Sequence, residues 1–164
     1  MREKITLPQG VRDILPDETK KIALVEDSAL GVFSSHGFER VITPLLEYVD
    51  VLTLGMGSNL KDRVLKFIEP STGRIMAIRP DITPQIARIA ATKLKGSKLP
   101  LKLCYSENIL RCDESGKSKE VIQTGAEYIT KAPAPETDAE MVVMAIEAIK
   151  KTGLKDFKVD IGDV

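Results

Sequence analysis

Two long strand-like runs joined by a short polar stretch constrain the fold of this chain more than any other feature. PLKLCYSENILRC covers residues 100–112 and EVIQTGAEYIT covers residues 120–130, with DESGKSK between them. The polar stretch is read as the loop that connects the two strands. The two runs therefore predict an antiparallel strand pair.

Further strands are expected on either side of this pair. VLKFIEP and RIMAIRP flank the turn STG within residues 64–80, a pattern that predicts a β-hairpin. A last strand is expected over FKVDIGDV, residues 157–164. Strands and helices do not alternate as a doubly wound sheet requires. The sequence therefore predicts a single α+β domain built on an antiparallel sheet.

Apolar residues at helical spacing predict three helices. The first is expected to begin near Asp17 as its N-cap. The second is expected to have Thr83 as its N-cap, with a proline at the first helical position. The third is expected to run through Lys151, with Thr137 and Glu140 as a capping box.

Composition narrows the class of protein. The chain has 24 basic and 24 acidic side chains, a balance that disfavours nonspecific binding to nucleic acid. No apolar run approaches the roughly 20 residues that span a bilayer, and the N-terminus lacks the apolar core of a signal peptide. Cys104 and Cys112 are eight residues apart in one strand-like run, about 27 Å along a strand, which is too far for a disulfide. A cytoplasmic protein with reduced thiols is the expected reading.

Three residues of the second long run share one face, because side chains alternate along a strand. They are Gln123, Gly125 and Glu127. Gly125 leaves a gap between two polar groups, where a ligand could lie against the sheet. The alternative is a solvent-exposed polar face with an incidental glycine, and the segment alone does not decide between the two.

Two charged residues could complete a site. Arg111 lies near the end of the first long run, where it could bind a carboxylate or simply be exposed before the turn. Asp81 precedes a predicted helix, where a carboxylate also favours the helix dipole. If Asp81 and Glu127 face one cavity with Arg111, they complement a zwitterion, that is, an amino acid. With one histidine and two distant cysteines, no typical zinc site or catalytic triad is expected.

Five stretches carry a resemblance to a known family. They are LPQGVRDILPDE, GFERVITPLLEY, IEPSTGRIMAIRPDITPQIARIAATKL, LPLKLCYSENILRCDE and IQTGAEYI. Together they resemble the class II histidyl-tRNA synthetase catalytic fold, and most closely its non-catalytic relatives, the regulatory subunits of ATP phosphoribosyltransferase. The synthetases usually carry Arg-Pro-Glu-Gly-Thr where this chain has Arg-Pro-Asp-Ile-Thr. Asp81 and Ile82 follow the regulatory pattern.

The resemblance implies a site for histidine. The positions that match histidine-binding positions of that fold are Asp81, Thr83, Arg111, Gln123 and Glu127. Arg111 matches the motif 2 arginine, although the Arg-x-Glu of the synthetases is Arg-Cys-Asp here, ending at Asp113. The motif 3 arginine of the synthetases has no counterpart in residues 1–164, which are expected to form the N-terminal part of a single class II synthetase-like domain.

The implied function is regulatory rather than catalytic. Such a subunit binds the catalytic phosphoribosyltransferase, which joins ATP to phosphoribosyl pyrophosphate in the first step of histidine biosynthesis, and senses histidine. No catalytic residue, cofactor or metal is expected. Homodimers are expected through the motif 1-like GFERVITPLLEY, whose apolar side chains are Val41, Ile42, Leu45 and Leu46. The alternative is a fragment of a histidyl-tRNA synthetase or a related amino-acid-adenylating ligase.

Overall fold

The computed structural model describes residues 6–54, 56, 61, 63–112 and 118–162. The chain divides into two compact units. Unit 1 contains residues 1–14, 42–95 and 106–123, and unit 2 contains residues 15–41, 96–105 and 124–164. The division falls within strands β5 (Leu101–Cys112) and β6 (Ser118–Ile129), so each long strand contributes residues to both units.

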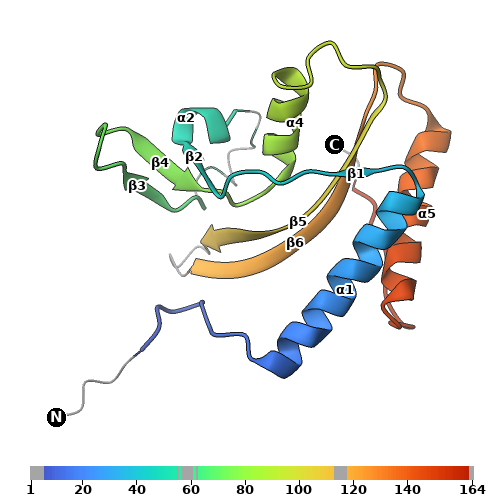
Figure 1. Cartoon of the computed structure of the whole chain (residues 1–164), viewed down its shortest axis with the longest axis horizontal. Coiled ribbons are helices and arrows are strands. Elements are labelled where there is room, and N and C mark those ends of the chain that lie inside the picture. The colour runs from blue at the N-terminus through green and yellow to red at the C-terminus, as the bar shows by residue number, and fades with distance from the viewer. Residues whose placement is uncertain (1–5, 55, 57–60, 62, 113–117, 163–164) are drawn as a thin grey trace. The chain divides into compact units, whose positions relative to one another are not determined.

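Unit 1 is built on a small antiparallel sheet in the order β2-β4-β3 (Figure 1). The strands are β2 (Leu46–Tyr48), β3 (Lys66–Ile68) and β4 (Ile75–Ile78). Two helices accompany them, α2 (Val49–Leu52) and α4 (Thr83–Ala91). Leu52, Met56, Val64 and Ala77 form a compact apolar cluster beside the sheet.

Unit 2 pairs two long helices, α1 (Pro16–Ser35) and α5 (Pro135–Lys151), which contact each other (Figure 1). Strand β1 (Glu39–Arg40) runs parallel to the first half of β5. The α1 residues Ala29, Val32 and Phe33 recur at helical spacing and are buried, as are Met144 and Ala148 one turn apart on α5. These five join Phe38 and Cys104 in the apolar core of the unit.

The main strand predictions are confirmed. The two long runs form β5 and β6, which are hydrogen-bonded neighbours, and residues 64–80 form the β3–β4 hairpin. The α+β class with antiparallel strand pairing is therefore confirmed, and the short strand β1 adds one parallel pairing. The predicted last strand is wrong over its described part, because residues 157–162 belong to no strand. A strand needs a hydrogen-bonding neighbour as well as apolar alternation, and Val159 and Ile161 are exposed instead.

The three helices exist, but their predicted caps are displaced. The N-cap of α1 is Leu15, and Pro16 precedes Asp17 inside the first turn. The N-cap of α4 is Ile82, and Thr83 is its first residue. Helix α5 begins at Pro135, so its predicted capping box lies within the helix. Proline fixes a φ angle that suits the first turn, so the helices start at or before the prolines.

Cys104 and Cys112 are free thiols. No helix in the described part of the chain is long and apolar enough to cross a membrane.

Candidate functional site

Asp81 lies at the junction between β4 and α4 in unit 1. Its Oδ1 accepts a hydrogen bond of 2.9 Å from the backbone N–H of Thr83. A side-chain oxygen that accepts from a backbone N–H two residues ahead is typical of Asp before a helix, and its charge favours the positive end of the helix dipole. Thr83 is therefore the first helical residue, held by Asp81, and not the N-cap that the sequence predicted.

Arg111 reaches the same junction from β5. Its Nε donates to the carbonyl oxygen of Pro80 at 2.9 Å, and its Nη2 lies 3.2 Å from Asp81 Oδ2. The Arg111 side chain is 45% exposed and that of Asp81 is 20% exposed. One positive and one negative group thus sit side by side at a surface that solvent reaches.

Gln123 completes the cluster from β6. Its Oε1 accepts a hydrogen bond of 3.0 Å from the backbone N–H of Ile82. Asp81, Thr83, Arg111 and Gln123, four of the five residues predicted for the site, therefore gather around one helix start in unit 1. We refer to these four residues as the junction cluster.

The fifth predicted residue, Glu127, belongs to unit 2. Its Oε1 accepts a hydrogen bond of 3.3 Å from the Tyr105 hydroxyl. The gap predicted at Gly125 is not open, because a Cβ atom there would lie 2.6 Å from the Tyr105 hydroxyl oxygen. The Tyr105 ring fills the space that Gly125 leaves.

Sequence reasoning missed the role of Arg79, which is buried with a 2% exposed side chain. Its Nη1 donates to the Thr43 carbonyl at 2.8 Å and to the Thr43 hydroxyl at 2.7 Å. Its Nε donates to the Asn108 carbonyl at 2.8 Å, and its Nη2 lies 3.2 Å from Glu107. Strand alternation is the sequence signal that could have found it. Arg79 is two residues from Ala77 and so shares its face, and both side chains are buried.

The buried network continues along α4. The side chain of Gln85 accepts a bond of 2.6 Å from the Thr43 hydroxyl and donates to the Pro44 carbonyl at 2.8 Å. It also donates to Glu47, which pairs with Arg88. We refer to Thr43, Glu47, Arg79, Gln85, Arg88 and Glu107 as the buried polar network. It ties residues 43–47 to the segment that carries Asp81.

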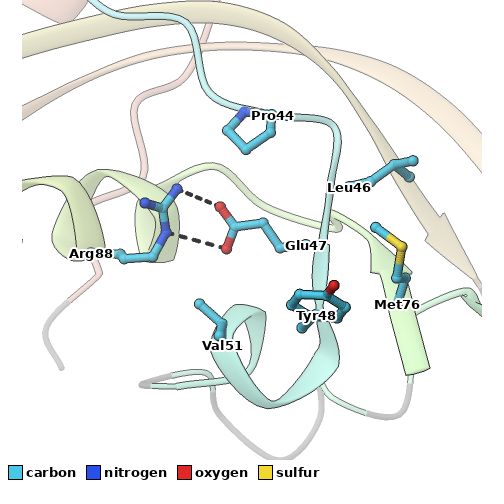
Figure 2. A pocket seen from close by; sticks show the side chains of 7 residues that line it. All are labelled: Pro44, Leu46, Glu47, Tyr48, Val51, Met76 and Arg88. Atoms are coloured by element: carbon cyan, nitrogen blue, oxygen red, sulfur yellow. Dashed lines mark hydrogen bonds and ion pairs between the residues drawn. The ribbon is translucent and has the colours of Figure 1, made fainter. Parts of the chain in front are cut away.

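A pocket of about 340 Å³ opens beside this network, also within unit 1 (Figure 2). Its lining comprises Pro44, Leu46, Glu47, Tyr48, Val51, Met76 and Arg88. Figure 2 shows the Glu47 carboxylate directed at the Arg88 guanidinium, so the two charges neutralise each other. The rest of the lining is largely apolar, which suits an apolar side chain better than a charged ligand.

The described residues hold no group of three or more His, Cys, Asp or Glu side chains that could bind a metal ion. Asp113, the departure from the synthetase motif 2, lies outside the described residues. The groups of the junction cluster are suited to binding a polar ligand. It offers a guanidinium, a carboxylate and an amide within one surface.

Comparisons with known proteins agree on one family. The family model described as histidyl-tRNA synthetase matches residues 10–164. A curated protein of Geobacter sulfurreducens, named ATP phosphoribosyltransferase regulatory subunit, is 49% identical over 160 residues, 96% of this chain and 36% of that protein. A protein of the same name from Syntrophotalea carbinolica is 44% identical over 171 residues, 100% of this chain and 40% of that protein. The chain thus spans well under half the length of these relatives.

Solved structures give the same picture. An ATP phosphoribosyltransferase regulatory subunit/histidyl-tRNA synthetase from Bacillus halodurans matches with a TM-score of 0.85 and 30% identity, over 96% of this chain and 40% of that one. Apo histidyl-tRNA synthetase from S. aureus matches with a TM-score of 0.75 and 25% identity, over 93% and 36%. These likenesses confirm the class II synthetase-like fold predicted from the sequence.

Proposed function

Because the chain belongs to the histidyl-tRNA synthetase family, we propose that it is part of a non-catalytic regulatory subunit of ATP phosphoribosyltransferase. The observation that carries this proposal is the name shared by curated relatives at 44–49% identity over 95–100% of the chain. Asp81 and Ile82, which follow the regulatory pattern, support it. We also infer that both units belong to one class II synthetase-like domain in a cytoplasmic protein, which the family match over residues 10–164 and the free thiols favour.

The partner in this proposal is the catalytic phosphoribosyltransferase chain. Adding the purified protein to that chain should raise the rate at which ATP and phosphoribosyl pyrophosphate are joined, and histidine should reduce that rate. Histidine-dependent exchange of pyrophosphate into ATP should stay at the blank level. Exchange well above the blank, without stimulation of the transferase, would instead establish the adenylating-ligase alternative.

Histidine is the ligand that we propose for Asp81, Thr83, Arg111, Gln123 and Glu127. Each Asp81 oxygen has accepted one hydrogen bond and can accept a second, so the carboxylate can also receive an ammonium. Arg111 has five N–H donors, and its exposed guanidinium can present some of them to a carboxylate. The junction cluster therefore suits both charged ends of an amino acid.

Asp81→Asn tests this assignment with little disturbance of the fold. The asparagine oxygen can still accept from the Thr83 N–H, so the helix start is kept while the negative charge is lost. We expect the affinity for histidine, measured by calorimetry, to fall by about 2–5 kcal/mol. Asp50→Asn is the matched control, because Asp50 is 70% exposed and should leave binding unchanged. Unchanged affinity and melting temperature in Asp81→Asn would mean that residues 79–84 form only a strand-to-helix junction and no ligand site.

We propose that the motif 1-like segment mediates self-association. Ile42 is 74% exposed, Leu45 is 45% exposed and Leu46 is 39% exposed. The pocket beside Leu46 offers an apolar recess for a side chain of a second copy (Figure 2). Ile42→Glu should shift sedimentation toward the monomer, since it would place a charge in an apolar interface. Leu54→Glu, equally exposed in unit 1 at 71%, is the control and should leave the oligomeric state unchanged.

A further inference from the structure

The space above Gly125 is filled by a tyrosine from the neighbouring strand. A Cβ atom at Gly125 would lie 2.6 Å from the Tyr105 hydroxyl oxygen and 2.8 Å from its Cζ. Both separations are shorter than real Cβ contacts allow. The ring therefore occupies this place only because residue 125 has no side chain.

The ring ends at an acidic group. Tyr105 is 3% exposed, and its hydroxyl donates to Glu127 Oε1 at 3.3 Å. Gly125 and Glu127 are two residues apart on β6 and so share a face of the strand. The Tyr105 ring thus crosses the strand at Gly125 and places its one donor against the carboxylate beside it. All three residues belong to unit 2.

We infer that Tyr105 is a positioning residue that holds the Glu127 carboxylate in one orientation, and that Gly125 provides the space this requires. The inference rests on the proposed function, in which Glu127 is one of the acids that meet histidine. A glutamate has several side-chain torsions, and fixing them before the ligand arrives lowers the entropy lost on binding. A buried phenol suits this task, because its hydroxyl can donate a hydrogen bond and its side chain has few torsions of its own.

Tyr105→Phe isolates the hydroxyl, since the ring still fills the space above Gly125. We expect the melting temperature to change little and the affinity for histidine to fall about tenfold, the size expected for one hydrogen bond to a charged group. Tyr128→Phe is the matched control. Tyr128 adjoins Glu127 on β6, but neighbouring side chains of a strand point to opposite faces, and the centre of the Tyr128 ring lies 5.4 Å from Lys102 Nζ. Removing the Tyr128 hydroxyl should therefore leave binding unchanged.

Coupling between the two residues separates positioning from a general structural effect. In a Glu127→Gln background, Tyr105→Phe should cause no further loss of affinity, because the orientation of the carboxylate no longer matters. A loss of the same size in both backgrounds would overturn the inference. So would full affinity in Tyr105→Phe when the unaltered protein binds histidine.

A second measurement needs no ligand. The side-chain carboxyl ¹³C resonance of Glu127 should move in Tyr105→Phe and in Gly125→Ala, which displaces the ring, and should stay in place in Tyr128→Phe. If the unaltered protein binds no histidine, the proposed ligand is wrong, but this resonance still decides whether Tyr105 sets the carboxylate. An unmoved resonance in Tyr105→Phe would overturn the inference whatever the protein binds.

Discussion

The most buried side chains of unit 1 include Arg79 and Gln85, whereas the core of unit 2 is apolar and contains Val32, Phe33 and Met144. An apolar core depends on volume and shape, and it tolerates exchanges that conserve both. A buried polar network depends on hydrogen bonds of fixed direction, and one lost partner leaves others unsatisfied. Unit 1 also carries the junction cluster, where geometry matters for recognition. We therefore expect the interior of unit 1 to depend on the exact chemistry of its side chains, and the core of unit 2 to depend mainly on their volume.

The largest effect is expected when the centre of the buried polar network is removed. Arg79→Met leaves Glu107 and the Thr43 and Asn108 carbonyls without their donor. We expect the free energy of unfolding to fall by about 3–5 kcal/mol, measured by denaturant titration. Arg74→Met removes a 50% exposed guanidinium from the same unit and should cost about 1 kcal/mol or less. Equal losses in the two variants would show that the buried Arg79 contributes no more to stability than an exposed arginine of the same unit.

The core of unit 2 should respond to volume rather than to chemistry. Met144 is 1% exposed, and Met144→Ala should lower the free energy of unfolding by about 2–5 kcal/mol by leaving a cavity. Met144→Leu conserves volume and should cost less than about 1.5 kcal/mol. The corresponding conservative exchange in unit 1, Arg79→Lys, should be much worse, because lysine lacks the planar fork that bonds in three directions. The comparison fails if Arg79→Lys is tolerated as well as Met144→Leu.

A smaller effect is expected at Thr43, whose hydroxyl lies between Arg79 and Gln85. Thr43→Val keeps the shape and removes the hydroxyl, so two buried groups lose a partner. The expected loss is about 1–3 kcal/mol. Thr92→Val makes the same change where an exposed hydroxyl donates to the Arg88 carbonyl, which water can satisfy instead. Thermal unfolding of both variants should show a clear loss only for Thr43→Val.

These two kinds of interior also explain what could be predicted from the sequence. The long strands, the β3–β4 hairpin and the helices depend on local periodicity, which the sequence displays directly. The buried polar network joins Arg79 to Thr43 across 36 residues and to Glu107 across 28 residues, and no local pattern encodes such pairings. The predicted last strand failed for a related reason, since strand formation depends on a neighbour and not only on alternation.

The candidate site shows the same limit. Four of its five predicted residues meet at one helix start. Asp81 and Thr83 lie where a strand gives way to a helix, which places polar groups predictably, whereas Arg111 and Gln123 reach that point from β5 and β6. At Gly125 the sequence indicated a missing side chain but could not say what would fill the space. Tyr105 fills it, and Tyr105 reads in the sequence as one apolar residue of a strand. Contacts between residues far apart in the sequence thus determine whether the space above a glycine is an open pocket or is filled by another side chain.

The smallest expected effect lies at the polar rim of unit 2, where Lys102 donates to Glu140 at 3.1 Å and to the carbonyl of His36 at 3.2 Å. The hydrogen bond and charge of Lys102 lower the pKa of Glu140, and His36, 3.7 Å away, acts in the same direction. Because the folded-state pKa lies below the ordinary value, the ionised carboxylate contributes stability at neutral pH. That contribution should be fully present above the ordinary carboxyl pKa and should be lost as the pH falls through the lowered pKa.

Lys102→Met should raise the pKa of Glu140 toward its ordinary value, which carboxyl ¹³C titration can measure. The stability difference between the unaltered protein and this variant should be largest near neutral pH and should shrink under acid conditions. A residual, pH-independent difference is expected, since Lys102 Nζ also lies 5.5 Å from the Phe38 ring and 5.4 Å from the Tyr128 ring. Lys98→Met removes an exposed lysine of the same unit and should leave the Glu140 titration unchanged. A Glu140 pKa that does not move in Lys102→Met would show that this rim contact, unlike the buried polar network of unit 1, exerts no measurable electrostatic effect.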